Sequence, residues 1–246
     1  MRFSGKKVIV TGAASGIGRA TAIKFAAEGA QVTIGDINEA GLAETASMMA
    51  SAPILQPYDA ADFDTCRALV AAGSADGLDV LCNVGGMLDW GPTPDFSEEK
   101  FDRILRVNLS SVYALCRAAI PHLIKSKGNI VNTASTAGLV GIAYTLAYSA
   151  SKHGVIAITK SLAIELASKE VRVNAICPGQ VNTAMGHAAP PEGDIDWGLV
   201  MRNVGKLGNG SAEPSDIADA FAFLASDEAR KISGTPLTVD CAMLAG

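Results

Sequence analysis

Short runs of apolar, mostly β-branched residues alternate with longer stretches of helical pattern along most of the chain. The runs that predict strands are residues 8–10, 32–34, 80–82, 129–133, 171–176 and 237–239. The stretches that predict helices are residues 17–28, 63–72, 107–124 and 148–167. Strands separated by helices indicate βαβ units. Because the strands are solid apolar runs rather than alternating ones, they favour a parallel sheet with helices on both faces, which is a doubly wound α/β fold.

We expect one domain over residues 1–246. This length is compatible with one or two domains, but no Pro/Ser-rich linker, charge run or internal repeat divides the chain. One stretch fits no element: residues 185–193 contain Pro190 and Pro191, which cannot continue a helix. This stretch is predicted to begin a lid over the functional site that extends to about residue 210.

Composition and charge exclude several classes of function. Hydrophobic residues make up 49% of the chain and charged residues 18%, which is enough apolar material for a compact core. The net charge is -5 with both signs interspersed, so neither nucleic acid nor an anionic membrane surface is an expected partner. The apolar runs are short, and the N-terminal residues lead directly into a strand, so we expect no membrane span and a cytoplasmic location.

The cysteines and histidines predict neither disulfides nor a metal site. The cysteines are widely scattered without the paired spacing of a zinc site or a redox dithiol, so we interpret them as reduced, mostly buried side chains. The histidines have no metal-ligand spacing either. These residues are Cys66, Cys82, Cys116, Cys177 and Cys241, with His122, His153 and His187.

A glycine-rich turn, Thr11-Gly12-Ala13-Ala14-Ser15-Gly16-Ile17-Gly18, follows the first predicted strand and opens the first helix. Glycines here let the backbone turn sharply and let a pyrophosphate approach the positive end of the helix. Three glycines also occur in ordinary strand-to-helix loops. The second strand, however, ends at Asp36, about twenty residues on, where a carboxylate can hold ribose hydroxyls. Together these features predict a dinucleotide site.

Asp36 also favours NAD over NADP as the dinucleotide. Its negative charge would repel a 2′-phosphate, and the next residues, Ile37 and Asn38, supply no cation. Arg19, just past the last glycine, is the residue most able to overturn this preference. We interpret Arg19 instead as a solvated helix charge.

Tyr148 and Lys152 lie one turn apart at the head of a predicted helix. A nearby ammonium stabilises a phenolate, so Lys152 is predicted to lower the Tyr148 pKa toward the range of a general base. Ser135 lies just beyond residues 129–133, at the strand edge where ligands of parallel sheets bind. A loop serine that caps a backbone amide is the alternative reading of Ser135.

In this combination and order, the residues resemble the classical short-chain dehydrogenase/reductase family over nearly the whole chain, which implies a Rossmann-type fold and nicotinamide-dependent oxidation of alcohols or reduction of carbonyls. The motifs that carry the resemblance are the glycine turn, Asp59, Asn83-Val84-Gly85-Gly86, Asn108, Ser135, Tyr148, Lys152 and Pro178-Gly179-Gln180-Val181-Asn182-Thr183.

The resemblance implies a role for each of these residues. Tyr148 would exchange a proton with the substrate oxygen, which Ser135 would orient. Lys152 would bind the nicotinamide ribose, and Asn108 would hold a water that links Lys152 to solvent. The main chain at Val181 would receive the carboxamide. The implied cofactor-binding residues are Gly12, Ser15, Gly16, Ile17, Gly18, Asp36, Ile37, Asp59, Ala60, Asn83, Val84, Gly85, Tyr148, Lys152, Pro178, Gly179, Val181 and Thr183.

Two segments depart from the family pattern. Val84-Gly85 stands where the family commonly has Asn-Ala, and we expect this to alter only packing beside the cofactor. Asp240-Cys241-Ala242 replaces the usual Asp-Gly-Gly, which puts the details of the C-terminal turn in doubt. A homotetramer is implied by the resemblance only.

The substrate is expected to be an uncharged, largely hydrophobic secondary alcohol or ketone. The candidate wall residues are Met87, Leu88, Trp90, Val140, Tyr144, Met185, Trp197 and Met201. This mixture is apolar and adaptable. Arg202 is the one nearby cation expected, and it is predicted to face solvent. Two alternatives stay open: a reductase of acyl chains on carrier-protein thioesters, and a dinucleotide-binding protein without catalysis.

Overall fold

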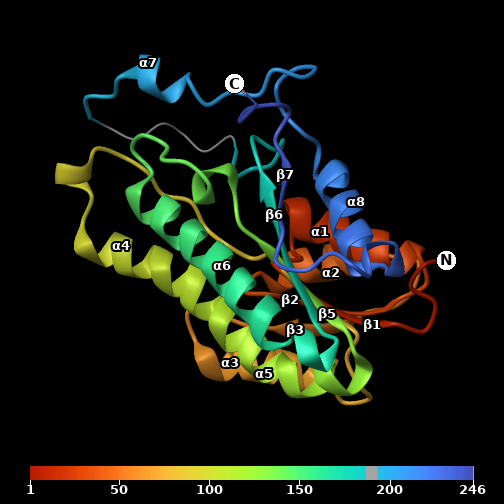
Figure 1. Ribbon diagram of the computed structural model, residues 1–246. Helices are drawn as coiled ribbons and strands as arrows, with labels where there is room; N and C mark the ends of the chain where they lie inside the picture. The colour runs from red at the N-terminus through yellow and green to blue at the C-terminus, as the bar shows by residue number, and fades with distance from the viewer. Residues whose placement is uncertain (187–192, 246) are drawn as a thin grey trace.

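The computed structural model describes residues 1–186 and 193–245. Within them, a seven-stranded parallel sheet has the order β3-β2-β1-β4-β5-β6-β7 (Figure 1). The strands are β1 (Lys7–Thr11), β2 (Gln31–Asp36), β3 (Ile54–Pro57), β4 (Val80–Asn83), β5 (Asn129–Thr133), β6 (Arg172–Pro178) and β7 (Pro236–Val239). The order reverses between β1 and β4, so a crevice opens beyond the carboxyl ends of these two strands.

Helices cover both faces of the sheet, as predicted. They are α1 (Gly16–Ala27), α2 (Glu39–Ser47), α3 (Phe63–Gly73), α4 (Glu98–Leu105), α5 (Ser111–Ser126), α6 (Leu146–Glu165), α7 (Trp197–Val200) and α8 (Pro214–Ala225). A π-helical turn, η2 (Arg106–Ser110), joins α4 to α5, and short 3₁₀ turns lie at η1 (Thr93–Asp95), η3 (Thr136–Gly138), η4 (Ala167–Lys169) and η5 (Asp227–Ala229). The doubly wound, Rossmann-type fold is thereby confirmed.

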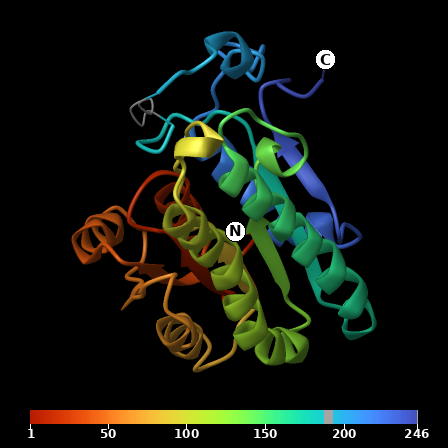
Figure 2. The same ribbon diagram turned by 90° about the vertical axis from the view of Figure 1, so that its left-hand side faces the viewer.

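Each face has its own apolar core. On one face α1, α2 and α8 pack together, and Phe25 of α1 and Phe221 of α8 belong to the same cluster of buried side chains. On the other face α3, α5 and α6 bury a second cluster that includes Leu69, Leu115 and Val155. Figure 2 shows the α4–α5 unit and α6 running side by side over this second face.

The first and last parts of the sequence meet in space. α1 and α8 lie against each other, as Figure 1 shows. An ion pair between Lys24 of α1 and Asp219 of α8, with Nζ and Oδ1 2.7 Å apart, adds to this contact. The helix that follows the glycine turn is therefore covered by a helix from residues 214–225.

Several elements have too weak a pattern to be predicted from the sequence. β3 spans four residues, is largely exposed and ends at Pro57. α4 begins with Glu98-Glu99-Lys100, so its apolar face is narrow. α8 begins with Pro214, which is tolerated in the first turn of a helix, and a capping box between Glu213 and Asp216 fixes its start. α2 is short and was likewise not expected.

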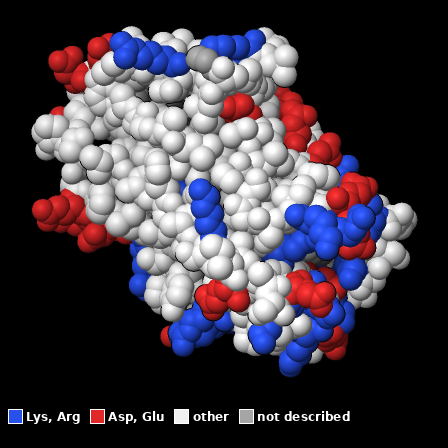
Figure 3. Space-filling model, viewed as in Figure 1, with Lys and Arg blue, Asp and Glu red and all other residues white. Residues whose placement is uncertain are grey.

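The surface over α6 carries few charged side chains, as the space-filling view shows (Figure 3). Leu146 and Ile164 of this helix are 53% and 80% exposed. In the part of the chain that the structure describes, no helix is long and apolar enough to cross a membrane. The five cysteines are free thiols, and all but the half-buried Cys241 are buried, as expected.

Candidate active site

A cleft of about 690 Å³ lies beyond the carboxyl ends of the strands. Of the catalytic and cofactor residues predicted from the sequence, all line this cleft except Asn83 and Asn108. They come from the ends of β1, β2, β4, β5 and β6 and from α6. Parallel strands bring their carboxyl ends to one edge of the sheet, so residues far apart in sequence meet there.

The glycine turn leaves no room for side chains. A Cβ on Gly18 would lie 2.0 Å from the Gly12 carbonyl oxygen, and one on Gly12 would lie 2.6 Å from the Gly85 Cα. Gly12 and Gly16 also have φ of +65° and +52°, which favours glycine. Ser15, the residue before α1, makes no side-chain cap, so the first amides of α1 remain available to a ligand. This cradle fits the pyrophosphate of a dinucleotide.

The Asp36 carboxylate is held at the end of β2 by two backbone amides. Its Oδ2 accepts a hydrogen bond from Ala14 N at 3.2 Å, and its Oδ1 accepts one from Asn38 N at 3.0 Å. The negative charge is therefore fixed beside the glycine turn, where an adenosine ribose would lie.

Arg19 differs from its expected role as a solvated charge. Its guanidinium donates to the Ala14 carbonyl oxygen and to Glu44, each at 2.6 Å, and to Thr45 Oγ1 at 3.0 Å. Arg19 thus ties the glycine turn to α2, because the carboxylate and hydroxyl of α2 offer it partners that the sequence pattern does not reveal.

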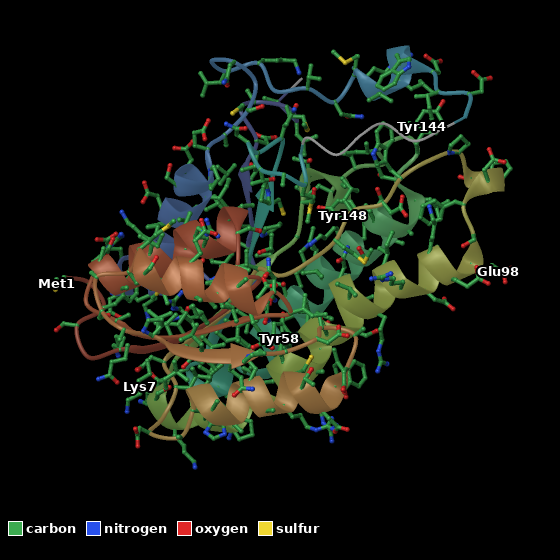
Figure 4. All side chains as sticks on the ribbon, turned by 180° about the vertical axis from the view of Figure 1, so that it is seen from behind. Met1, Lys7, Tyr58, Glu98, Tyr144 and Tyr148 are labelled. Atoms are coloured by element: carbon green, nitrogen blue, oxygen red, sulfur yellow. The ribbon has the colours of Figure 1, made fainter. Side chains whose placement is uncertain are left out.

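Tyr148, Lys152 and Ser135 converge at the other end of the cleft. Lys152 Nζ lies 5.5 Å from the centroid of the Tyr148 ring and donates to the Thr133 carbonyl oxygen at 2.8 Å. Ser135 precedes η3, and its Oγ accepts from Ala137 N at 3.2 Å. The serine therefore caps a backbone amide and also lines the cleft, so both of its predicted roles are compatible with its position. Figure 4 shows Tyr148 in the interior, with Tyr144 nearer the surface.

Burial shifts the pKa values of both titratable groups. It raises the pKa of the Tyr148 phenol, and the hydrogen bond with Ser135 partly offsets this. It lowers the pKa of Lys152 to about 8. The expected lowering of the Tyr148 pKa by Lys152 is therefore not found in this state of the protein. The Lys152 ammonium is directed at a carbonyl oxygen, and burial opposes its own charge.

Asn108 lies in the π-helical turn and is 1% exposed. Its amide makes a reciprocal pair with the Met87 backbone, because Nδ2 donates to Met87 O and Oδ1 accepts from Met87 N, each at 2.8 Å. Gly86 lies between this amide and Lys152: a Cβ there would be 3.2 Å from Asn108 Oδ1 and 3.6 Å from Lys152 Nζ. The water expected at Asn108 stays a prediction.

Asn83 lies below the cleft rather than in its wall. Its Nδ2 donates to Asn132 Oδ1 at 2.8 Å, and Asn132 Nδ2 donates to Thr159 Oγ1 at 2.9 Å. Asn83 thus connects β4 to β5 and α6. The Asn83 side chain is 2% exposed, and the predicted contact of this residue with a cofactor stays a prediction.

The wall of the cleft agrees in part with the candidates from the sequence. Met87, Leu88, Trp90 and Met185 line it, whereas Val140, Trp197 and Met201 do not. Tyr144 lines a smaller adjacent hollow of about 300 Å³. Wall residues that were not predicted from the sequence include Tyr58, Arg103, Ile142, Ala143, Val200 and Met243. Among the described residues, Arg103 and Lys152 are the cations that line the cleft. Arg202, the cation expected from the sequence, does not line it.

Met243 reaches the cleft because of the turn after β7. Cys241 and Ala242 have φ of +51° and +61°, so the backbone keeps a left-handed turn that glycines would adopt more easily. The Cys241 carbonyl oxygen accepts hydrogen bonds from Lys206 N at 2.6 Å and Leu207 N at 3.0 Å. The departure from Asp-Gly-Gly therefore alters the side chains of this turn and retains its left-handed conformation.

The expected lid is described only in part, because residues 187–192 lie outside the described residues. Two contacts join residues 193–200 to the rest of the cleft mouth. The Trp197 and Trp90 rings meet edge to face with centroids 6.3 Å apart, and Asp196 N donates to the Tyr144 hydroxyl at 2.9 Å. Both contacts link α7 and the residue before it to the loops that contain Trp90 and Tyr144.

Known proteins are similar to this chain in sequence and in fold. Residues 12–243 match the sequence model of a family described as enoyl-(acyl carrier protein) reductase. A 3-oxoacyl-(acyl-carrier-protein) reductase of Thermotoga maritima is 36% identical over 98% of each chain. A 2,5-dichloro-2,5-cyclohexadiene-1,4-diol dehydrogenase of Sphingobium indicum is 38% identical over 97% of this chain and 96% of the other. The crystal structure of a short chain dehydrogenase from Mycobacterium paratuberculosis bound to NAD has a TM-score of 0.93 and 30% identity, with 100% of both chains covered.

Proposed function

Because the chain belongs to the classical short-chain dehydrogenase/reductase family, whose members act on CH–OH groups with NAD(P), we propose that it interconverts a hydrophobic secondary alcohol and its ketone with NAD. The observation that carries the proposal is a single cleft with two chemically distinct ends. One end has the glycine turn and Asp36, and the other has Ser135, Tyr148 and Lys152.

The residues at the second end can manage the proton. Bound NAD supplies the hydride acceptor, or NADH the donor, for the substrate carbon. Tyr148 would take the hydroxyl proton in oxidation and return it to the carbonyl oxygen in reduction. Ser135 would bond to the same oxygen and fix its position. Since burial raises the Tyr148 pKa, oxidation should speed up as pH rises and more phenol loses its proton.

The fixed charge of Asp36 supports NAD as the preferred cofactor. Its two amide partners hold the carboxylate where a 2′-phosphate would have to lie. Arg19 is the cation that could have reversed this preference, but its guanidinium is already paired with Glu44 and with Ala14 O. The solved relative that contains NAD has the same fold over its full length.

The wall at the catalytic end supports a hydrophobic substrate, such as a cyclic or aromatic alcohol. Most of the wall side chains there are apolar, and Arg103 is the one cation besides Lys152 among the described wall residues, so the support for an uncharged substrate is the predominance of apolar side chains. The apolar side chains are Met87, Leu88, Trp90, Ile142, Met185, Val200 and Met243. The relative from Sphingobium indicum is named for a cyclic diol.

Reduction of a carrier-protein thioester is the second candidate, because the Thermotoga maritima relative has that name. Such an enzyme docks an acidic carrier through basic surface residues. The net charge of -5 and Asp36, which disfavours NADPH, count against it. A non-catalytic dinucleotide-binding protein is less well supported, since Ser135, Tyr148 and Lys152 all line the cleft.

We further propose one catalytic domain over residues 1–246 with a lid at about 185–210. The homotetramer implied by the family resemblance stays a prediction that sedimentation can check.

An NAD-reduction screen tests the proposal. The panel should contain cyclic alcohols, aryl carbinols, hydroxysteroids, sugars, hydroxy acids and 3-hydroxyacyl thioesters, each with NAD and with NADP. We expect the highest turnover on cyclic or aryl alcohols with NAD. Highest turnover on sugars, hydroxy acids or thioesters would contradict the proposed substrate class.

A further inference from the structure

Tyr58 lies at the floor of the cleft at the point where three strands end. It follows β3, and its backbone N donates to the Asp36 carbonyl oxygen at 3.1 Å. Its side chain is 6% exposed and lines the cleft. Figure 4 shows this tyrosine below Tyr148. The family motif in this part of the sequence is Asp59, one residue later, and it gives Tyr58 no role.

The Tyr58 hydroxyl occupies the place that a side chain on Gly85 would need. A Cβ on Gly85 would lie 3.0 Å from the Tyr58 hydroxyl oxygen and 3.3 Å from Gly12 N. Both distances are shorter than ordinary van der Waals contacts of a methyl group. Gly85 in place of alanine therefore does more than alter packing, because it makes room for a specific hydroxyl.

A second glycine, Gly35, leaves space for the Tyr58 ring. A Cβ on Gly35 of β2 would lie 3.1 Å from Cδ1 of Tyr58 and 2.6 Å from Cδ2 of Leu69. Glycine at both 35 and 85 thus accommodates the aromatic side chain from ring to hydroxyl. Because the ring is bulky and nearly rigid, close packing against Gly35 and Gly85 restricts its orientation.

A small hydrogen-bond network lies beside the hydroxyl at the glycine turn. Thr11 Oγ1 accepts from Val84 N at 2.8 Å and from Gly85 N at 3.0 Å, which links the ends of β1 and β4. Burial raises the pKa of the Tyr58 phenol, and the nearby Thr11 side chain opposes part of this rise. Gly12, next to Thr11, touches Gly85 so closely that a Cβ on it would lie 2.6 Å from the Gly85 Cα.

We infer that Tyr58 is a cofactor-positioning residue whose hydroxyl, packed against Gly85 beside Thr11, sets the spacing between the glycine turn and the segment after β4. This inference rests on the proposed dinucleotide site. The network lies between the two backbone segments that would face the adenosine and pyrophosphate, whereas Tyr148 and Ser135 belong to other strands and helices. Loss of the hydroxyl should therefore weaken dinucleotide binding and leave the chemical step unchanged.

A double-mutant cycle with Tyr58→Phe and Gly85→Ala tests this inference, with NADH as the probe in fluorescence titrations. Tyr58→Phe should weaken NADH binding about two- to tenfold, the usual effect of losing one polar interaction between uncharged groups, and leave kcat at saturating cofactor within about twofold. Gly85→Ala should weaken binding more in the wild-type background than in the Tyr58→Phe background, where the hydroxyl oxygen is gone. Tyr113→Phe, at a tyrosine that is 53% exposed, is the matched control and should change neither quantity.

The outcomes separate the inference from the proposed function. If wild-type protein binds no NADH, the proposed function fails and the inference fails with it. If wild-type protein binds NADH but Tyr58→Phe binds it equally well, even with a lowered Tm, Tyr58 is only structural and the inference is overturned. Additive effects of the two substitutions on the NADH Kd would also overturn it, because the hydroxyl and the Cβ would then not compete for one space.

Discussion

Replacing Lys152 with methionine should stabilise the protein at neutral pH while it abolishes turnover. Lys152 is 4% exposed, and its one hydrogen bond goes to the Thr133 carbonyl oxygen. No carboxylate pairs with it among the described residues, so its charge is buried without compensation. Methionine has a similar shape and carries no charge, so the substitution removes the charge with little change in packing.

The size of the effect follows from the lowered pKa. Burial lowers the Lys152 pKa from 10.5 to about 8. At pH values between about 8 and 10.5, the unfolded chain binds more protons than the folded one, so the free energy of unfolding rises with pH. Below about pH 8 both states bind the proton, and the contribution of Lys152 to stability is at its lowest. At about 1.4 kcal/mol per pH unit, the charged lysine costs about 3 kcal/mol at pH 7 and less than about 1 kcal/mol at pH 10. Loss of the bond to Thr133 offsets about 1 kcal/mol. We expect a net gain of about 2 kcal/mol at pH 7 that disappears by pH 10.

Urea denaturation at pH 7 and pH 10 measures this difference. Lys160→Met is the matched control, because Lys160 is exposed on the same helix and its replacement should change the free energy of unfolding by less than about 0.5 kcal/mol. A Lys152→Met variant that is less stable than wild type at pH 7 would refute the reasoning. So would a gain of equal size at both pH values, since a buried charge cannot produce it.

Two further predictions concern the proposed roles of individual residues. Tyr148→Phe should leave NADH affinity near that of wild type and lower turnover by at least roughly two powers of ten, because one proton-transfer group is lost; steady-state kinetics with comparable activity would refute the assignment. Asp36→Ala should weaken NAD binding and improve NADP binding, because the carboxylate held by Ala14 N and Asn38 N is removed. A wild-type enzyme that prefers NADPH in the same kinetics would show that Asp36 has been misinterpreted.

Strongly patterned elements could be predicted from the sequence, and so could residues tied to them. The strand at Asn129–Thr133 has the predicted bounds. All five of its residues are buried, as in a central strand that is covered on both faces. The prediction that the glycine turn, Tyr148 and Lys152 lie in one cleft agrees with the structure. The glycine turn directly follows β1, and Tyr148 and Lys152 lie in the first turns of α6, so both positions follow from elements with a clear sequence pattern.

Contacts that depend on side-chain partners could not be predicted. Arg19 binds Glu44 and Thr45, which are about 25 residues away, and no periodicity encodes such a pair. Tyr58 enters the cleft because Gly35 and Gly85 leave space, which is a property of three strands together. Met243 does so through a left-handed turn at Cys241 and Ala242, where residue type suggests no such conformation.

The packing of α1 against α8 has a consequence for synthesis of the chain. α1 ends at Ala27 and α8 begins at Pro214, so about 190 residues are made between them. At 5–20 residues per second, the interval is roughly 10 to 40 s. During that time the side of α1 that carries Ala22 and Phe25 has no α8 to cover it, and β1 also waits for residues 80–83. A nascent chain of this topology closes its nucleotide-binding half late, which favours slow folding and a need for protection against aggregation until residues 214–225 have emerged.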